Sequence, residues 1–219
     1  MDTENIALII VDMQNDFIHD NGFILKYSEG VGVAKDALKR LRGPILYIKE
    51  LAEFFRSKGK EVIYIYTAWA PDYSDVAIPL KKMHDKAREA GCLVEGSWGA
   101  RIIDELTPEK TDHIVLKKAY GGFFQTSLDR VLRNLGIKTL VMTGVATNFC
   151  VETTTREAVA YGYEVIFVSD ATATFDSAGH DATLKVIATG FGEVMSTEEV
   201  KELLEKKGLR DKGVIENVK

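Results

Sequence analysis

Residues 139–170 read TLVMTGVATNFCVETTTREAVAYGYEVIFVSD, in which two apolar runs flank a helix-like segment. Thr139–Thr143 and Glu164–Val168 are predicted strands, and Val151–Tyr161 is a predicted helix that ends at Gly162. A strand, a helix and a second strand in this order join parallel neighbours through a right-handed crossover. The stretch therefore predicts one unit of a parallel sheet.

The same alternation extends in both directions along the chain. Further apolar runs predict strands at residues 6–11, 61–67, 113–116 and 193–195. Helical spacing predicts a helix that begins at Val33, bends or breaks at Gly43-Pro44 and continues through Phe55. It also predicts helices at residues 128–135 and 183–189, and a last helix that begins at Ser196 or Thr197. We therefore expect a doubly wound α/β fold with three layers and a mostly parallel sheet of about six strands.

A single domain is expected to span residues 1–219, because no repeat, low-complexity tract or linker divides the chain. Residues 68–101 form the one long connection that we expect to be irregular, and such loops usually carry function or disorder. Residues 208–219 mix charges and are expected to be a frayed tail.

Composition excludes several classes of protein. The formal net charge is −5, so no basic block is available to neutralise the phosphates of nucleic acid or of an anionic membrane. Residues 1–5 carry two acids and no base, and we expect no signal peptide and a cytoplasmic location. In a reducing cytosol, Cys92 and Cys150 are expected to be two free thiols.

Three reactive side chains follow predicted strands: Asp12 after the first, Lys117 after the third and Cys150 after the fourth. Ligands of an open parallel sheet bind at the carboxyl ends of its strands, so these groups are expected to converge. Taken one at a time, each residue has an ordinary structural interpretation. Cys150 could be a small buried apolar side chain, Asp12 a hydrogen-bond acceptor in a loop, and Lys117 a solvated residue at the end of a strand. Together they predict acyl transfer through a thioester. The helix N-terminus and the ammonium would lower the pKa of the thiol, and the carboxylate would take its proton.

Four segments carry a family resemblance: ALIIVDMQNDF at residues 7–17, EGSWGARIIDEL at 95–106, residues 115–152 with the block GVATNFCVE, and VSDATAT at 168–174. On these motifs the chain resembles the isochorismatase-like cysteine hydrolases, which include nicotinamidase, N-carbamoylsarcosine amidase and ureidoacrylate amidohydrolase. The segments follow one another in the family's order and span most of the chain.

The resemblance implies roles for individual residues. Asp12 matches the family's base, Cys150 its nucleophile and Lys117 its triad lysine, with Lys118 as the alternative one position further on. The family also has a cis peptide, here Val145–Ala146, and an oxyanion site made by the N–H groups of Ala146 and Cys150. The substrate pocket would be walled by Phe17, Trp69 and Tyr120, with Tyr73 nearby.

Departures from the family pattern narrow the function. Nicotinamidases follow the second strand with histidine metal ligands, whereas residues 67–75 read TAWAPDYSD, so we expect no metal and no cofactor. Cys150 disfavours the isochorismatases proper, which commonly lack it. The ureidoacrylate and N-carbamoyl branch matches best, although Gly121 replaces that branch's serine and leaves the substrate open. Trp98 is read as structural, and Cys92 has no residue beside it that would activate it.

The sequence thus predicts a cysteine-dependent hydrolase of a C–N bond in a small amide or ureide. A small-molecule substrate is the expected partner, and the resemblance implies a homo-oligomer, a dimer or tetramer. The alternatives are a nicotinamidase-type or isochorismatase-type hydrolase and a non-catalytic relative that only binds a small molecule. A nucleotide-binding protein whose TGVATN turn cradles phosphate is disfavoured, because the chain lacks both glycine-rich phosphate motifs.

Overall fold

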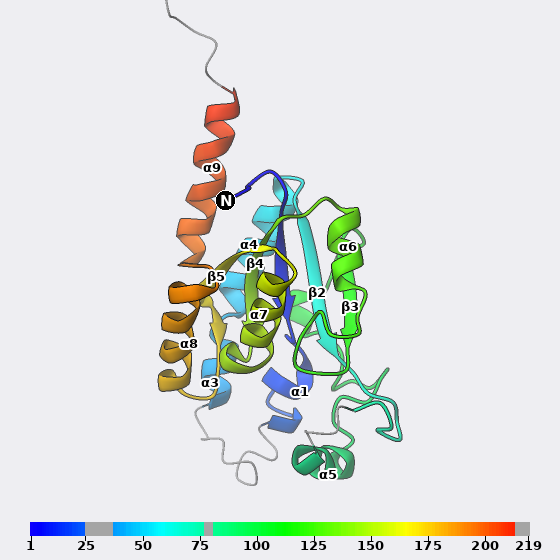
Figure 1. The fold of residues 1–219 in the computed structure, drawn as a ribbon. Coiled ribbons are helices and arrows are strands. Elements are labelled where there is room, and N and C mark those ends of the chain that lie inside the picture. Colours follow the sequence, from blue (N-terminus) through cyan, green and yellow to red (C-terminus); the bar gives the residue numbers. More distant parts are fainter. Residues whose placement is uncertain (25–36, 77–80, 213–219) are drawn as a thin grey trace, which may run out of the picture.

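The computed structural model describes residues 1–24, 37–76 and 81–212. A sheet of six parallel strands lies between two layers of helices, in the order β3-β2-β1-β4-β5-β6 (Figure 1). The strands are β1 (Ile6–Val11), β2 (Glu61–Thr67), β3 (His113–Lys117), β4 (Thr139–Val145), β5 (Glu164–Ala173) and β6 (Glu193–Met195). The predicted doubly wound α/β fold is confirmed.

Helices cover both faces of the sheet, and each face has its own apolar core. One layer contains α3 (Ala37–Arg42), α4 (Ile45–Ser57) and α9 (Thr197–Lys212), and the other contains α6 (Leu128–Asn134), α7 (Glu152–Ala160) and α8 (Ser177–Gly190). Strand β1 supplies Ile6, Leu8 and Ile10 to the first core and Ala7, Ile9 and Val11 to the second. Because both faces are buried, the strand is a continuous apolar run rather than an alternating one.

Shorter elements lie beyond the carboxyl ends of the strands. They are α1 (Asn15–Ile18) and α5 (Lys81–Ala90) (Figure 1), together with the π-helical turn η3 (Thr147–Val151), which follows β4. The 3-10 turn η2 (Asp104–Leu106) packs against α4. Helix α5 interrupts the stretch 68–101 that was expected to be irregular. Its sequence KKMHDKAREA holds too few apolar residues for helical spacing to be visible, so the sequence analysis missed it.

Several boundaries differ from the expected ones. Strands β4 and β5 extend past Thr143 and Val168, and α9 runs to Lys212, so residues 208–212 of the expected frayed tail are helical. Val33 and residues 213–219 lie outside the described residues. Ser196 caps α9 reciprocally: its backbone N–H donates to the Glu199 carboxylate, and its hydroxyl accepts from the Glu199 N–H.

In the parts of the chain that the structure describes, no helix combines the length and the apolar character needed to cross a membrane.

Candidate active site

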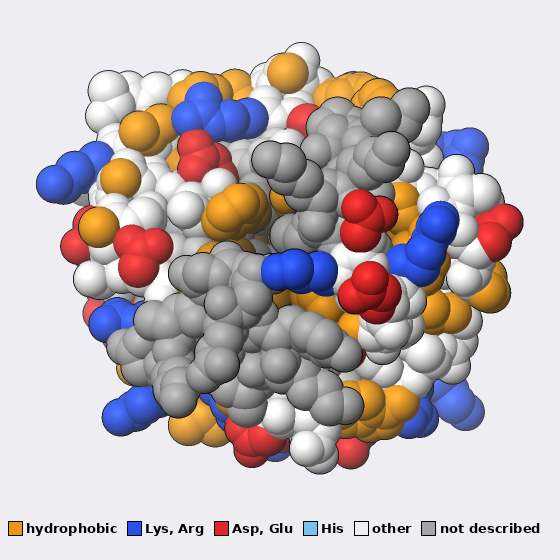
Figure 2. Space-filling model, turned by 90° about the horizontal axis from the view of Figure 1, so that it is seen from below, with side chains coloured by type: hydrophobic (Ala, Val, Ile, Leu, Met, Phe, Trp, Pro, Cys, Tyr) orange, Lys and Arg blue, Asp and Glu red, His pale blue; other side chains and the backbone are white. Residues whose placement is uncertain are grey.

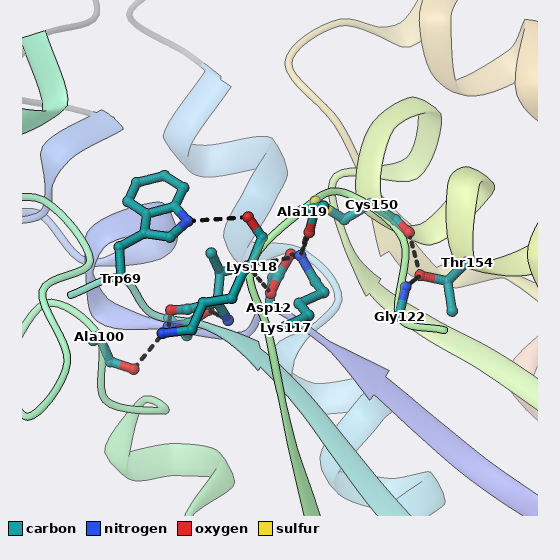
Figure 3. A network of polar contacts seen from close by, with 11 residues as sticks. Asp12, Trp69, Ala100, Lys117, Lys118, Ala119, Gly122, Cys150 and Thr154 are labelled. Carbon is teal, nitrogen blue, oxygen red and sulfur yellow. Dashed lines mark hydrogen bonds and ion pairs between the residues drawn. The ribbon is translucent and has the colours of Figure 1, made fainter. Parts of the chain in front are cut away.

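The structure brings Asp12, Lys117 and Cys150 together at the carboxyl end of the sheet (Figure 3). Asp12 directly follows β1 with a left-handed φ of 52°, Lys117 ends β3, and Cys150 lies in η3, the turn that connects β4 to α7. The Lys117 ammonium nitrogen lies 2.8 Å from Oδ2 of Asp12 and 3.5 Å from Sγ of Cys150. Asp12 and Lys117 are each 1% exposed and Cys150 is 7% exposed, so the cluster is nearly dry.

Thr67, the last residue of β2, joins the two charged groups. Its hydroxyl donates to Oδ1 of Asp12 at 3.0 Å and accepts from the Lys117 ammonium at 2.6 Å. The ammonium also donates to the carbonyl oxygen of Ala119 at 3.0 Å. The sequence analysis assigned no role to Thr67, although its position at the end of the second predicted strand placed it at this edge.

Gln14 holds this edge of the sheet in register. Its amide nitrogen donates to the carbonyl oxygens of Thr67 and Ala100, both at 2.7 Å, and its amide oxygen accepts from the Thr67 N–H at 2.8 Å. The side chain is fully buried and its partners lie 53 and 86 residues away in sequence. Gln14 therefore fixes the end of β2, and with it Thr67, relative to Asp12.

The structure brings Lys117 to the thiol and leaves Lys118 at the rim. The Lys118 ammonium lies 2.7 Å from Asp75 and 3.5 Å from Glu95, and its side chain is about one third exposed. Neighbouring residues of a strand point to opposite sides, so a shift of one position exchanges a buried side chain for an exposed one.

Burial dominates the electrostatics of the cluster. It raises the pKa of the Cys150 thiol, the Asp12 charge raises it further, and Lys117 offsets only part of this effect. The expected lowering of this pKa is therefore wrong, because the sequence shows the nearby cation but not the loss of water. Burial lowers the pKa of Lys117, but Asp12 and Cys150 together outweigh it and raise the pKa, which keeps the ammonium charged. The raised pKa favours the protonated form of the Cys150 thiol, which lies beside the Asp12–Lys117 ion pair.

The turn that carries Cys150 is tied down on both sides. The Val145–Ala146 peptide bond is cis, and the carbonyl oxygen of Ala146 accepts from the N–H groups of Phe149 and Val151. The carbonyl oxygen of Cys150 accepts from the Thr154 hydroxyl, which itself accepts from the Gly122 N–H (Figure 3). Together these bonds link the thiol-bearing turn to the segment that follows β3.

A cavity of about 360 Å³ opens above the thiol. Phe17, Trp69 and Tyr120, the expected wall residues, line it together with Asp12, Lys117, Cys150, Val145 and Ala146. The sequence analysis missed further lining residues, namely Phe23, Phe149, Phe175, Asn148 and Asp176. Figure 2 shows this face, on which a few hydrophobic side chains are visible near the centre beside a Lys or Arg side chain, and other hydrophobic and charged side chains are scattered over the rest. The cavity combines reactive groups at its base with walls of aromatic and aliphatic side chains.

Three other residues singled out in the sequence have different positions. Tyr73 does not line the cavity: its hydroxyl donates to the carbonyl oxygens of Ala87 and Cys92, and burial raises its pKa to about 12. Trp98 is 40% exposed and packs edge-on against His19. Cys92 lines the cavity wall, and burial together with the charge of Asp16 raises its pKa.

No three His, Cys, Asp or Glu side chains gather as metal ligands within the described ranges. Asp75, from the segment where nicotinamidases carry their metal ligands, instead accepts from the Ala70 N–H at 2.9 Å and pairs with Lys118.

Comparison with known proteins identifies the family of this chain. The isochorismatase domain matches residues 6–199. A ureidoacrylate amidohydrolase from Agrobacterium fabrum is 36% identical over 177 residues, which cover 76% of this chain and 75% of that protein. The ureidoacrylate amidohydrolase of Yersinia enterocolitica is 35% identical over 212 residues and covers 90% of this chain and 87% of the relative.

Solved structures give the same result. A cysteine hydrolase from Pseudomonas syringae pv. phaseolicola has a TM-score of 0.81 at 30% identity, covering 94% of this chain and 95% of that one. N-carbamoylsarcosine amidase from Thermoplasma acidophilum has a TM-score of 0.69 at 28% identity, covering 88% of this chain and 96% of that one. The chain belongs to the isochorismatase family and is a hydrolase of amide or ureido C–N bonds.

Proposed function

We propose that this protein hydrolyses a small amide or ureide through a thioester on Cys150, with Asp12 as the base and Lys117 as the charge that stabilises the thiolate. One observation carries the proposal: a thiol, an ammonium and a carboxylate meet within 3.5 Å contacts at the base of a cavity large enough for a small molecule. A pocket that only binds has no need of these three groups together.

The first half of the reaction forms the covalent intermediate. Asp12 accepts the thiol proton as Cys150 attacks the substrate carbonyl, so the buried thiolate exists only briefly beside the Lys117 ammonium. The tetrahedral oxyanion is bound by the N–H groups of Ala146 and Cys150, and losing one such donor typically costs about 10²–10³ in rate. Asp12 returns the proton to the leaving nitrogen, and ammonia or an amine departs.

The second half regenerates the enzyme. Asp12 takes a proton from water, the hydroxide attacks the thioester carbonyl, and the Cys150 sulfur leaves and is reprotonated. An amide substrate yields a carboxylic acid. A ureide yields a carbamic acid, which loses carbon dioxide to leave an amine. This chemistry requires no metal or cofactor.

The test is ammonia release from a panel of ureides, N-carbamoyl amino acids, nicotinamide and simple amides. Cys150→Ala is expected to abolish turnover without lowering the melting temperature, because the small side chain leaves the fold intact. Cys92→Ala is the matched control, since it removes the second buried thiol of the same cavity and is expected to keep turnover. Wild-type rates in Cys150→Ala would refute the thioester mechanism. Turnover of nicotinamide would contradict the expectation, drawn from the missing histidine ligands, that the protein is not a nicotinamidase.

We further propose that the protein is cytoplasmic, forms a dimer or tetramer, and binds neither nucleic acid nor membranes. The family resemblance supports the oligomer, and the net charge of −5 supports the absence of polyanionic partners. Light scattering of the purified protein gives the oligomeric state, and a monomer at micromolar concentration would contradict it.

A further inference from the structure

The cavity also indicates what kind of amide or ureide it accepts. Resting on the proposed function, we propose that the substrate is an uncharged compound whose amide or ureido group carries an apolar group, aryl or branched alkyl, and that anionic substrates are rejected. The relatives above are named for ureidoacrylate, whose acrylate group is a carboxylate at neutral pH. The proposal therefore separates this chain from them in substrate charge.

The first argument is that the cation in the cavity is already engaged. Lys117 is the one Lys or Arg among the described residues that line it. An ammonium has three N–H bonds, and those of Lys117 donate to the Thr67 hydroxyl, the Ala119 carbonyl oxygen and the Cys150 sulfur. Its charge is neutralised by Asp12 at 2.8 Å. No donor of this group remains for a substrate carboxylate.

The next cation along the chain is engaged as well. The Lys118 ammonium lies between Asp75 and Glu95, while its carbonyl oxygen accepts from the indole N–H of Trp69 at 3.2 Å. Turning this side chain toward the cavity would break one close ion pair and leave two carboxylates unpaired. Lys118 therefore stabilises the rim of the cavity beside Trp69 and is not available to bind a substrate carboxylate.

The second argument is the sign of the charges that line the cavity. The described lining carries two carboxylates, Asp12 and Asp176, against the single ammonium of Lys117. Asp176 caps α8 by accepting from the Gly179 N–H and is exposed, which puts its charge at the mouth rather than in the buried base. An anion that enters loses water and meets a net negative charge, both of which disfavour binding.

The third argument is the apolar, aromatic character of the side chains that line the cavity. The Phe149 ring contacts Tyr120 and Phe175 at centroid distances of 5.9 and 5.8 Å, and Phe17, Phe23 and Trp69 also line the cavity. Tilted and edge-on aromatic surfaces gain most from an apolar or aromatic group of the ligand. A small charged substrate would leave this surface unused.

A matched pair of ureides tests the proposal. 2-Phenylethylurea and N-carbamoylphenylalanine differ only by a carboxylate, so the ratio of their kcat/KM values reports the effect of charge. We expect the neutral compound to be preferred by about tenfold or more. Asp176→Asn keeps the helix cap but removes the charge, and it is expected to shift the ratio toward the anion by about three- to tenfold. Asp181→Asn, on the same helix but not among the lining residues, is the control that should leave the ratio unchanged.

Binding gives a second readout that does not depend on turnover. Calorimetric titration of the Cys150→Ser variant, whose hydroxyl can still accept from the Lys117 ammonium, with the same pair should show tighter binding of the neutral compound. Equal or tighter binding of the anion, or an equal or higher kcat/KM for it in the wild type, would overturn the proposed substrate class. If the wild type released no ammonia that depends on Cys150, the catalytic proposal would be wrong. The binding preference would then still show whether the cavity favours the neutral compound over the anion.

Discussion

Replacing Thr67 by valine tests whether the bridge between Asp12 and Lys117 organises the active site. Valine has nearly the same shape, so no cavity forms, but the bond to Oδ1 of Asp12 and the bond from the Lys117 ammonium are both lost. Hydrogen bonds to charged groups contribute about 1.5–3 kcal/mol each. Their effects are not additive where partners are shared, and we expect a loss of about 2–4 kcal/mol in the free energy of unfolding.

Two assays measure the consequences of Thr67→Val. For a chain of this length, about 1 kcal/mol corresponds to a shift of about 2–4 °C in the melting temperature, so a decrease of roughly 5–15 °C is expected. We expect kcat to fall about 10- to 100-fold because the base and the ammonium lose their common anchor. KM should change little, because the aromatic walls are untouched.

Two control variants make the result specific. Thr67→Ser restores the hydroxyl and should recover most of the lost kcat. Thr155→Val makes the same chemical change at another buried threonine, whose hydroxyl has no hydrogen-bond partner among the described residues, and it should be neutral or slightly stabilising. If Thr67→Val matches Thr155→Val in both melting temperature and kcat, the proposed role of the bridge is wrong.

Three further predictions each concern a single residue. Gly144→Ala should unfold the protein or lower its melting temperature strongly, because φ is 109° and the added Cβ would lie 2.1 Å from the carbonyl oxygen of Val11. A melting temperature within about 2 °C of wild type would correspond to no more than about 1 kcal/mol and would contradict this prediction. Since burial raises the pKa of Cys150, its alkylation by iodoacetamide in the Cys92→Ala background should keep accelerating above pH 9, and a plateau at neutral pH would argue against the buried thiol. Burial lowers the pKa of His180 below 6.5, so the folded state holds fewer protons than the unfolded state and loses stability as pH falls through this value. Denaturant titrations at pH 7.5 and 5.5 should show a smaller loss in His180→Gln, and an equal loss would exclude the effect.

The sequence by itself determined the architecture and the edge at which the chemistry occurs. Apolar runs such as residues 6–11 and 139–143 alternate with amphipathic segments, and this pattern is local, so it can be read without contacts. Parallel strands align their carboxyl ends, which places Asp12, Lys117 and Cys150 at one edge before any distance is known. The aromatic walls at Phe17, Trp69 and Tyr120 came from the family resemblance.

Only the tertiary structure decided which lysine faces the thiol, what links the charged groups and how burial acts on them. The contacts of Gln14 and Thr67 join segments more than 50 residues apart in sequence, and no local pattern encodes such pairs. Likewise, the pKa of Cys150 is raised because layers from distant parts of the chain remove its water, which outweighs the neighbouring cation that the sequence makes visible. Periodicity is a property of neighbours along the chain, whereas desolvation is a property of neighbours in space.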